Sequence, residues 1–230
     1  MSIIKILFFG AHPDDVELGC GGTIHKFCSE GHIVRVVSIG EGTSCRFEKK
    51  HIQSVKVRNE IKKRTESSIR SLDSLGVSSY EFYNLPCGRL DSISLIDINK
   101  IIEKEIDSFQ PDKVFTHAKN DTNNDHSIIH RSSIIATRPG SRTFVKDVYL
   151  YEVLSSTEWN FITSFAPNLF ITLSESDIKA KIKSIKFYET EVRSFPYPRS
   201  SEGIITLANF RGMQANTKYS EAFILFRSIC

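Results

Sequence analysis

One histidine and two adjacent aspartates follow the first apolar run of the chain. They are His12, Asp14 and Asp15 in the segment FFGAHPDDVELGCGG, where Pro13 fixes the backbone between them. In a turn, one carboxylate can coordinate a metal while the other faces a bound water, and hydrolysis of an amide requires this division of labour. The alternative is a structural pair, in which one aspartate caps a helix and the other stabilises the turn.

A second polar cluster, THAKNDTNNDH, occupies residues 116–126. A histidine from this cluster would complete a set of two histidines and one carboxylate with a position open for water, as in catalytic rather than structural zinc sites. His126 is the first candidate because Asp125 lies beside it and a helix follows. We assign His130, one helical turn later, to packing or to the support of a ligand.

Three glycines after the first cluster raise a competing interpretation as a phosphate-binding loop. A dinucleotide-binding loop has its glycines directly after the strand, whereas Gly19, Gly21 and Gly22 come after the two aspartates. These carboxylates would repel a pyrophosphate. We therefore predict that the glycines permit close packing of a helix.

Short apolar runs alternate with longer segments of helical periodicity, which is typical of a parallel sheet covered by helices. We expect strands at residues 3–9, 33–39, 80–84, 113–116 and 147–153, with a weaker one at 169–172. Helices are expected at 54–75, 93–109 and 178–192, and another begins near Asp125. The predicted fold is α/β: a Rossmann-like, doubly wound, mostly parallel sheet with helices on both faces. Ligands of such sheets bind at the carboxyl edge of the strands, where both polar clusters lie.

Composition and length restrict the class of protein. The 230 residues, 40% of them hydrophobic, fit one globular domain spanning 1–230. The net charge of +3 discriminates little, but the one dense basic run, at residues 49–64, is interrupted and flanked by glutamates and fits a solvated helix face better than a nucleic-acid patch. The first apolar run has no signal-peptide cleavage pattern and no segment approaches the length of a membrane span, so we expect a cytoplasmic protein without membrane insertion. The five cysteines form no CxxC pair and are odd in number, which favours reduced thiols.

Three separated motifs resemble those of a known family, in the same order along the chain. AHPDDVELGCGGTI is similar to the first motif of the LmbE-like zinc deacetylases, and THAKNDTNNDHSIIHR is similar to their second. The C-terminal segments YEVLSSTEWNF, FAPNLFITLSESDIKAKIKSIKFYETEVRSFPYPRS and LANFRGMQANTKYSEAF resemble the bacterial branch. The family includes the GlcNAc-phosphatidylinositol deacetylase (PIG-L) group and the deacetylases of mycothiol and bacillithiol synthesis. The resemblance covers the whole length of the chain.

The resemblance implies a role for each polar residue. His12, Asp15 and His126 would bind one zinc ion per chain, or another divalent metal. Asp14 would be the general base that accepts a proton from the attacking water and then passes a proton to the departing amine. Asp125 would orient a neighbouring polar group. These roles agree with the two polar clusters at the sheet edge.

The chain departs from the family pattern at three places. Many relatives have a histidine that stabilises the oxyanion where this chain has Asn123, whose amide can donate a hydrogen bond but carries no positive charge. Cys87 stands where relatives often have an acidic residue before glycine, and Tyr197 stands where many bacterial relatives have histidine. These departures leave the implied metal ligands intact and leave the substrate open.

Substrate contacts are predicted from Arg64, His117 and Arg199. Arg64 lies in a helix of the kind from which the family contributes an arginine, and Arg58 is a competing choice. The expected substrate is a small N-acylated, hydroxylated molecule: an N-acetylated amino sugar, nucleotide sugar or sugar conjugate. The alternatives are a non-catalytic nucleotide- or sugar-binding α/β module and a metal-dependent amidase for a non-sugar amide. Because relatives are often oligomeric, a homo-oligomer is also open.

Overall fold

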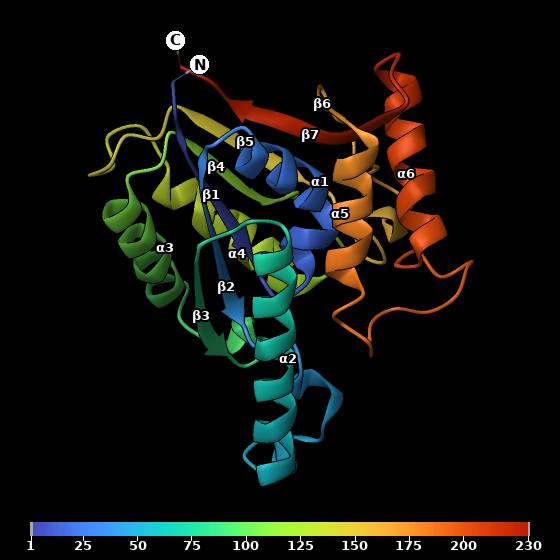
Figure 1. Ribbon diagram of the computed structural model, residues 1–230. Coiled ribbons are helices and arrows are strands. Elements are labelled where there is room, and N and C mark those ends of the chain that lie inside the picture. The colour runs from blue at the N-terminus through green and yellow to red at the C-terminus, as the bar shows by residue number, and fades with distance from the viewer. Residues whose placement is uncertain (1, 230) are drawn as a thin grey trace.

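The computed structural model describes residues 2–229 and has a seven-stranded sheet at its centre (Figure 1). The strands are β1 (Lys5–Gly10), β2 (Ile33–Gly40), β3 (Ser79–Leu85), β4 (Lys113–His117), β5 (Asp147–Tyr151), β6 (Leu169–Leu173) and β7 (Tyr219–Arg227). The longer helices are α1 (Asp15–Ser29), α2 (Val55–Ser74), α3 (Leu95–Phe109), α4 (Asn124–Ala136), α5 (Glu175–Ile185) and α6 (Ser201–Gln214). Every predicted strand is present.

The strand order is β3-β2-β1-β4-β5-β7-β6. Strands β1 to β5 pair in parallel, and β7 runs antiparallel to both of its neighbours, β5 and β6. The chain builds outward from β1 to β2 and β3, then crosses to the other side of β1 with β4. The strand order therefore reverses between β1 and β4, and the prediction of a doubly wound, mostly parallel sheet is confirmed.

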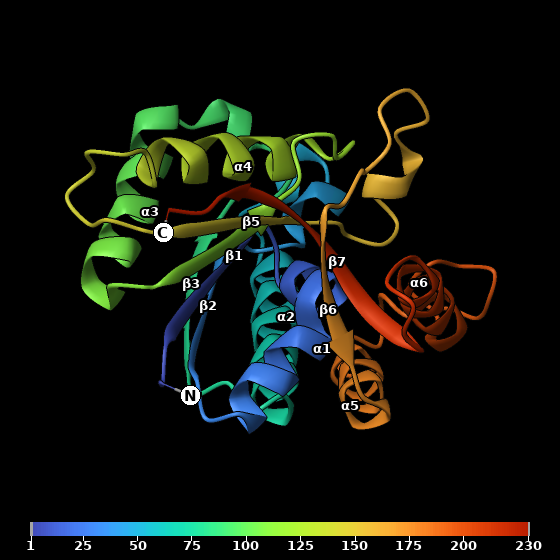
Figure 2. The same ribbon diagram turned by 90° about the horizontal axis from the view of Figure 1, so that it is seen from above.

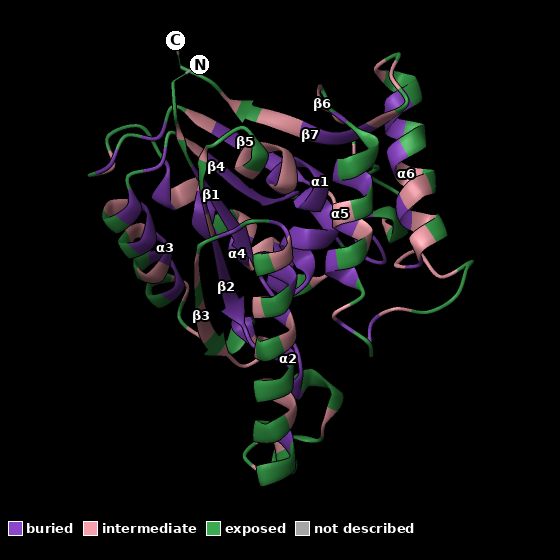
Figure 3. Cartoon of the chain, in the orientation of Figure 1, coloured by how far each residue is buried: buried purple, intermediate pink, exposed green. Residues whose placement is uncertain are grey.

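Two helical layers cover the sheet, α3 and α4 on one face and α1, α2 and α5 on the other (Figure 2). Alternate residues of β1 divide between them: Ile6 and Phe8 join the core beneath α1, whereas Leu7 and Phe9 join the core beneath α3 and α4. The inner strands are buried along most of their length (Figure 3). This burial on both faces accounts for the nearly continuous apolar runs in the sequence.

Helix α1 lies unusually close to the sheet because of its glycines. A Cβ on Gly19 would stand 2.4 Å from a ring carbon of Tyr151 in β5, and one on Gly22 would stand 2.5 Å from Leu173 in β6. Neither neighbour can move away, because both are buried. The prediction that these glycines serve close helix packing is confirmed.

Three parts of the fold differ from the prediction. Helix α5 begins at Glu175, where Ser174 and Asp177 form a capping box, and it ends at Ile185 rather than at residue 192. Helix α6 and strand β7 were not predicted. Strand β7 carries a charged residue in its apolar run, Glu221, which is buried and accepts a hydrogen bond of 2.6 Å from Lys181. The ion pair with Lys181 allows this carboxylate to be buried within a strand.

Two further observations concern the described residues. None of the helices within residues 2–229 is long and apolar enough to cross a membrane. The four cysteines in this range, Cys20, Cys28, Cys45 and Cys87, are free thiols as predicted, and Cys230 lies outside it.

Candidate metal centre

The turn after β1 presents His12, Asp14 and Asp15 in three different directions. The backbone N–H of His12 donates a 2.7 Å hydrogen bond to Asp15 Oδ2, and Asp15 then begins α1. Between them, Asp14 has φ of 107°, a conformation that residues other than glycine rarely adopt. Such a conformation costs on the order of 1–3 kcal/mol and is concentrated at functional sites. The strained turn separates the two neighbouring carboxylates.

Atoms of His12, Asp15 and His126 converge at the carboxyl edge of the sheet. Asp15 Oδ2 lies 3.4 Å from His12 Nδ1 and 3.3 Å from His126 Nε2, and one potential ligand atom from each residue lies within 4.8 Å of the others. Tetrahedral zinc with bonds of about 2.0–2.1 Å spaces its ligand atoms about 3.3 Å apart. The structure thus brings together the three residues that the resemblance implies, from the turn after β1, from α1 and from α4.

The chemistry of these groups fits a metal ion. All three side chains are buried, and Nε2 of His126, the nitrogen that faces Asp15, has no hydrogen-bond partner among the described residues. Two imidazole nitrogens and one carboxylate oxygen are the ligand set of several catalytic zinc sites, which leave a fourth position for water or substrate. Buried polar atoms without partners are costly unless a ligand satisfies them.

Without a metal, this cluster binds protons instead. Burial disfavours the charged form of each imidazole. The negative charge of Asp15, together with hydrogen bonds to Asp15 and to Asp125 or Asp121, outweighs burial and raises the pKa of His12 to about 10 and that of His126 to about 9. The two histidines hold the pKa of Asp15 well below its usual range despite its burial. A metal that binds here therefore displaces protons, and its affinity rises with pH.

Metal-free protein should lose stability as the pH rises above about 7.5. Protonation of His12 and His126 stabilises the fold fully below their ordinary pKa of 6.5, and this contribution is lost as the pH rises through about 9 and about 10. Bound zinc would replace these protons, so zinc-loaded protein should keep its melting temperature over the same range. Thermal melts at about pH 7.5 and 9, with zinc or with chelator, test this. A metal-free melting temperature that rises with pH would contradict it.

Two aspartates contact the ring nitrogens of His12 and His126 that do not face Asp15. Asp125 Oδ2 lies 2.8 Å from His12 Nε2, and the backbone N–H groups of Gly88 and Leu90 donate to the same carboxylate at 2.6 and 3.2 Å. Asp121 Oδ2 lies 3.1 Å from His126 Nδ1. Each aspartate leaves the opposite ring nitrogen free to face Asp15, which is the usual arrangement behind histidines that bind metals. The sequence predicted an orienting role for Asp125 but none for Asp121.

Asp121 is fixed by hydroxyl groups from the loop after β5. Thr157 Oγ1 donates to its Oδ2 at 2.6 Å, and Ser156 donates to its Oδ1. The hydrogen bond and positive charge of protonated His126, together with these hydroxyl bonds, outweigh burial and lower the pKa of Asp121 to about 2. Asp121 is therefore ionised and acceptor-only, so it selects the His126 tautomer with its proton on Nδ1.

Replacing Asp121 with Asn should weaken zinc binding by about 10- to 100-fold, because the amide can present a donor to His126 Nδ1 and favour the wrong tautomer. Competition with a zinc indicator dye measures the affinity. Asp177→Asn is the matched control, because Asp177 Oδ1 contacts His25 Nδ1 at 2.7 Å outside the metal cluster. Equal zinc affinity in Asp121→Asn and the control would contradict the role of Asp121.

Asp14 is not among the three converging residues, and its carboxylate contacts two arginines. Its Oδ2 lies 2.7 Å from Arg64 Nη2 and 2.7 Å from Arg199 Nη1. Burial raises the pKa of Asp14, and the two guanidinium groups offset this effect only in part. A carboxylate with a raised pKa beside a metal cluster is suited to accept a proton near neutral pH.

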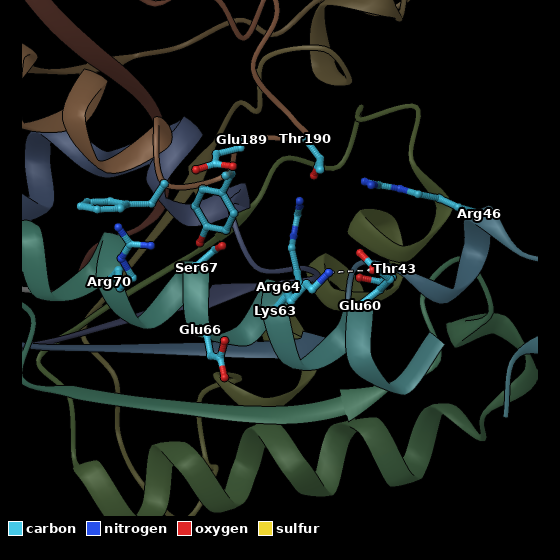
Figure 4. A pocket seen from close by; sticks show the side chains of 12 residues that line it. Thr43, Arg46, Glu60, Lys63, Arg64, Glu66, Ser67, Arg70, Glu189 and Thr190 are labelled. Atoms are coloured by element: carbon cyan, nitrogen blue, oxygen red, sulfur yellow. Dashed lines mark hydrogen bonds and ion pairs between the residues drawn. The ribbon is translucent and has the colours of Figure 1, made fainter. Parts of the chain in front are cut away.

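Glu191 joins these arginines into one network. Its Oε1 lies 2.7 Å from Arg64 Nη1 and 2.6 Å from Arg46 Nη2, and its Oε2 lies 3.2 Å from Arg199 Nη1. The predicted helix that would have carried Glu191 ends six residues earlier, so this residue is in a turn and reaches the site. Arg46 and Arg64 also line a polar cavity of about 410 Å³ beside α2 (Figure 4).

Asn123 lies at the start of α4, three residues before His126. Its Oδ1 accepts a 2.9 Å hydrogen bond from the backbone N–H of Asp125 and so caps the helix. The helix cap uses the amide oxygen, and the amide NH₂ is the group of this side chain that can donate to a substrate. The predicted oxyanion role of Asn123 stays a prediction.

Replacing Asn123 with Ser should lower turnover by about ten- to a thousandfold, because serine keeps the cap acceptor and lacks the NH₂ donor. Asn123→Ala removes both and should in addition cost about 1 kcal/mol of stability. Rates with zinc-loaded protein and thermal melts separate the two effects. Full turnover in Asn123→Ser would show that another group stabilises the oxyanion.

His117 is placed differently from the expectation of a substrate contact. Its side chain is fully buried at the end of β4, and its Nε2 accepts a 2.8 Å hydrogen bond from the backbone N–H of Ala11. Burial and the nearby charge of His126 lower the pKa of His117 well below its usual value. The neutral ring stacks on His126 with centroids 4.0 Å apart, which leaves it no exposed surface for a substrate. His130, through Nδ1, contacts the carbonyl oxygen of His117 at 2.9 Å, in agreement with a packing role.

Known proteins are similar to this chain in sequence and in fold. The model of the PIG-L family, GlcNAc-PI de-N-acetylase, matches residues 7–137. The uncharacterised deacetylase YaiS of Escherichia coli K12 is 27% identical over 191 residues, covering 80% of this chain and 90% of YaiS.

Two solved structures show the same fold. The N,N'-diacetylchitobiose deacetylase of Pyrococcus horikoshii, solved with its inhibitor, has a TM-score of 0.74 at 22% identity and covers 97% of this chain and 84% of its own. The 4-carboxy-2-hydroxymuconate hydratase GalB of Pseudomonas putida KT2440 has a TM-score of 0.75 at 20% identity and covers 99% of this chain and 98% of its own. The fold alone thus does not define the reaction. Because the family match extends over more than half of the sequence and includes both polar clusters, this chain belongs to the PIG-L (GlcNAc-PI de-N-acetylase) family.

Proposed function

We propose that this protein is a zinc-dependent N-deacetylase. In this proposal it hydrolyses the acetamide of an N-acetylated amino sugar, nucleotide sugar or sugar conjugate, and releases acetate and a free amine. The observation that carries the proposal is the position of Asp14, a buried carboxylate on a strained turn between two residues of the converging metal set. A module that only binds sugars or nucleotides has no need of a base beside a metal.

The metal would be held by His12, Asp15 and His126, and when bound it would polarise the acyl carbonyl and lower the pKa of water. Asp14 accepts a proton as water attacks the carbonyl carbon, and it returns a proton to the nitrogen as the C–N bond breaks. The NH₂ of Asn123 donates to the carbonyl oxygen as negative charge develops there. Asp121 and Asp125 keep the two imidazoles in the tautomers that bind metal.

Arg64 and Arg199 are proposed to hold Asp14 and to meet the substrate. Arg199 comes from the loop before α6, where its Nε donates to Ser155 Oγ at 2.5 Å, so its position is fixed from two sides. Guanidinium groups offer several donors for sugar hydroxyls or a phosphate. The cavity beside Arg64 is lined by the hydroxyl-bearing Thr43, Ser67 and Thr190, which suits a hydroxylated substrate (Figure 4).

One relative supports the choice of reaction, and one protein of the same fold supports the choice of substrate class. YaiS is named as a deacetylase, and the Pyrococcus horikoshii protein is named as a deacetylase of N,N'-diacetylchitobiose, an acetylated amino sugar. An amidase for a non-sugar amide would use the same metal, base and proton transfers. The alternatives therefore differ in the substrate rather than in the reaction.

A panel of acetylated amines tests the proposal. Zinc-loaded protein would be incubated with N-acetylglucosamine, diacetylchitobiose, a nucleotide-linked N-acetylglucosamine and N-acetyl amino acids, and amine and acetate would be measured. Equal amounts of both products from a sugar are expected. Preference for N-acetyl amino acids would favour the non-sugar amidase, whereas saturable sugar binding without either product would favour the binding module.

A further inference from the structure

Two cysteines far apart in the sequence lie in contact beside the metal centre. Cys45 belongs to a short 3₁₀ helix (Ser44–Arg46), and Cys87 lies in the loop after β3. Their sulfur atoms are 3.2 Å apart, with Cys87 Sγ–H donating to Cys45 Sγ. A disulfide has its sulfurs about 2.05 Å apart, so an approach of about 1.2 Å would join them.

One buried carboxylate holds both cysteine-bearing loops in place. Glu41 Oε2 accepts hydrogen bonds from the backbone N–H groups of Thr43 and Ser44, at 2.5 and 2.9 Å. Its Oε1 accepts a 2.9 Å bond from the backbone N–H of Cys87. Because Glu41 is 2% exposed and bridges the two loops, the contact between the sulfurs is built into the fold.

The two thiols differ in access and in chemistry. Cys45 is exposed to solvent, whereas Cys87 is buried behind it. The hydrogen bond from Cys87 lowers the pKa of Cys45 to about 6, and the same bond raises the pKa of Cys87. An accessible thiolate with a neighbouring thiol is the arrangement of cysteines that react with oxidants and then form a disulfide.

The remaining cysteines provide an internal comparison. Cys20 is fully buried, and Cys28 is half-buried. Burial raises the pKa of both thiols. Both are therefore expected to stay reduced under conditions that oxidise Cys45.

We propose that Cys45 and Cys87 form a reversible disulfide when the protein meets a hydroperoxide, and that this bond lowers the activity of the metal centre. In the first step, the Cys45 thiolate attacks one oxygen of hydrogen peroxide and becomes a sulfenic acid, while the O–O bond breaks and the other oxygen leaves as hydroxide, which takes a proton from solvent to become water. In the second, Cys87 attacks the Cys45 sulfur, the S–O bond breaks, and the Cys87 proton leaves with that oxygen as water. Two thiols are oxidised, and one hydroperoxide is reduced.

The link from the disulfide to the metal centre runs through the residue after Cys87. The backbone N–H of Gly88 donates to Asp125 Oδ2 at 2.6 Å, and the same oxygen lies 2.8 Å from His12 Nε2. A Cβ built on Gly88 would stand 2.9 Å from Cys45 Cβ, so Gly88 lies directly against Cys45 as well as bonding to Asp125. Drawing Cys87 toward Cys45 therefore pulls on the support of His12.

Peptide mapping of peroxide-treated protein tests the bond directly. Zinc-loaded protein would be treated with hydrogen peroxide, its remaining thiols blocked, and its digest analysed by mass spectrometry without reductant. The expected product is a peptide pair joined through Cys45 and Cys87, lighter by two hydrogens and separated again by dithiothreitol. Cys28→Ser should give the same product. Cys87→Ser should instead leave a sulfenic acid on Cys45 that dimedone traps.

Activity is measured in parallel. The activity measurement depends on the proposed function, whereas the peptide mapping does not. Oxidation should lower turnover by about tenfold, the scale on which support of a metal ligand matters, and dithiothreitol should restore it. Cys45→Ser should have the activity of the reduced protein and keep it in peroxide. Unlinked Cys45 and Cys87 after peroxide, or a link to another cysteine, would overturn the proposal, as would a disulfide that leaves turnover unchanged. Cys87 also lies within metal-binding distance of His12 and Asp125. Protection of both thiols by a second zinc equivalent would therefore show a metal site in place of a redox pair.

Discussion

Replacing Asp14 with Asn is expected to reduce turnover by about a hundredfold or more while zinc content stays near one per chain. The amide keeps the size of the side chain and much of its hydrogen bonding, but it cannot accept the proton of the attacking water. Asp14 Oδ2 contacts Arg64 and Arg199 rather than the converging metal set, so its replacement leaves the ligands in place. Steady-state rates and metal analysis of the same sample provide the measurement.

The loss in Asp14→Asn must be separated from a loss of structure, because the substitution leaves two guanidinium groups beside a neutral amide. A thermal melt of the zinc-loaded variant is the control. Added zinc should not restore the rate. A variant that turns over substrate at the wild-type rate, or that regains its rate with excess zinc, would show that Asp14 is not the base.

Replacing Asp15 with Asn is expected to lower zinc affinity by about a hundredfold or more. Unlike in Asp14→Asn, excess zinc should restore part of the activity. The Asp15 carboxylate contacts His12 and His126 at 3.4 and 3.3 Å, and it is the only anion in the converging set. An amide oxygen can still bind zinc, but without a negative charge. Zinc affinity is measured by competition with a chelator of known affinity.

The two aspartate variants form a matched pair, because they make the same chemical change one residue apart. If both lose zinc equally, the strained turn does not divide the roles of the two carboxylates. If Asp14→Asn loses zinc and Asp15→Asn does not, the base and the ligand have been assigned the wrong way round.

The location of the site could be predicted because it depends on strand direction. The runs that became β1 and β4 are short and apolar, and each is followed by a polar cluster. Parallel strands end at the same edge, so His12 and His126 had to approach each other if both runs belonged to one sheet. The metal ligands and the base follow from the family resemblance, and the structure brings the proposed ligands within reach of one ion.

The residues that support the site were harder to predict. Asp121 lies in the second polar cluster, but only the loop after β5 shows that its carboxylate is directed at His126. Glu191 was placed in a helix, and its contact with Arg64 depends on where α5 ends. Cys45 and Cys87 are 42 residues apart and meet only because β2 and β3 are neighbours. Such contacts between distant loops leave no local pattern in a sequence.

Zinc titration of metal-free protein, with acetate release from an N-acetylated amino sugar as the readout, tests the central claim most directly. We expect no release in the presence of chelator, and a rise in rate as zinc is added that stops at one equivalent per chain. Asp15→Asn should need a higher zinc concentration to reach its plateau. Acetate release by the metal-free protein, or no release from any member of the panel at any zinc concentration, would contradict a zinc-dependent N-deacetylase.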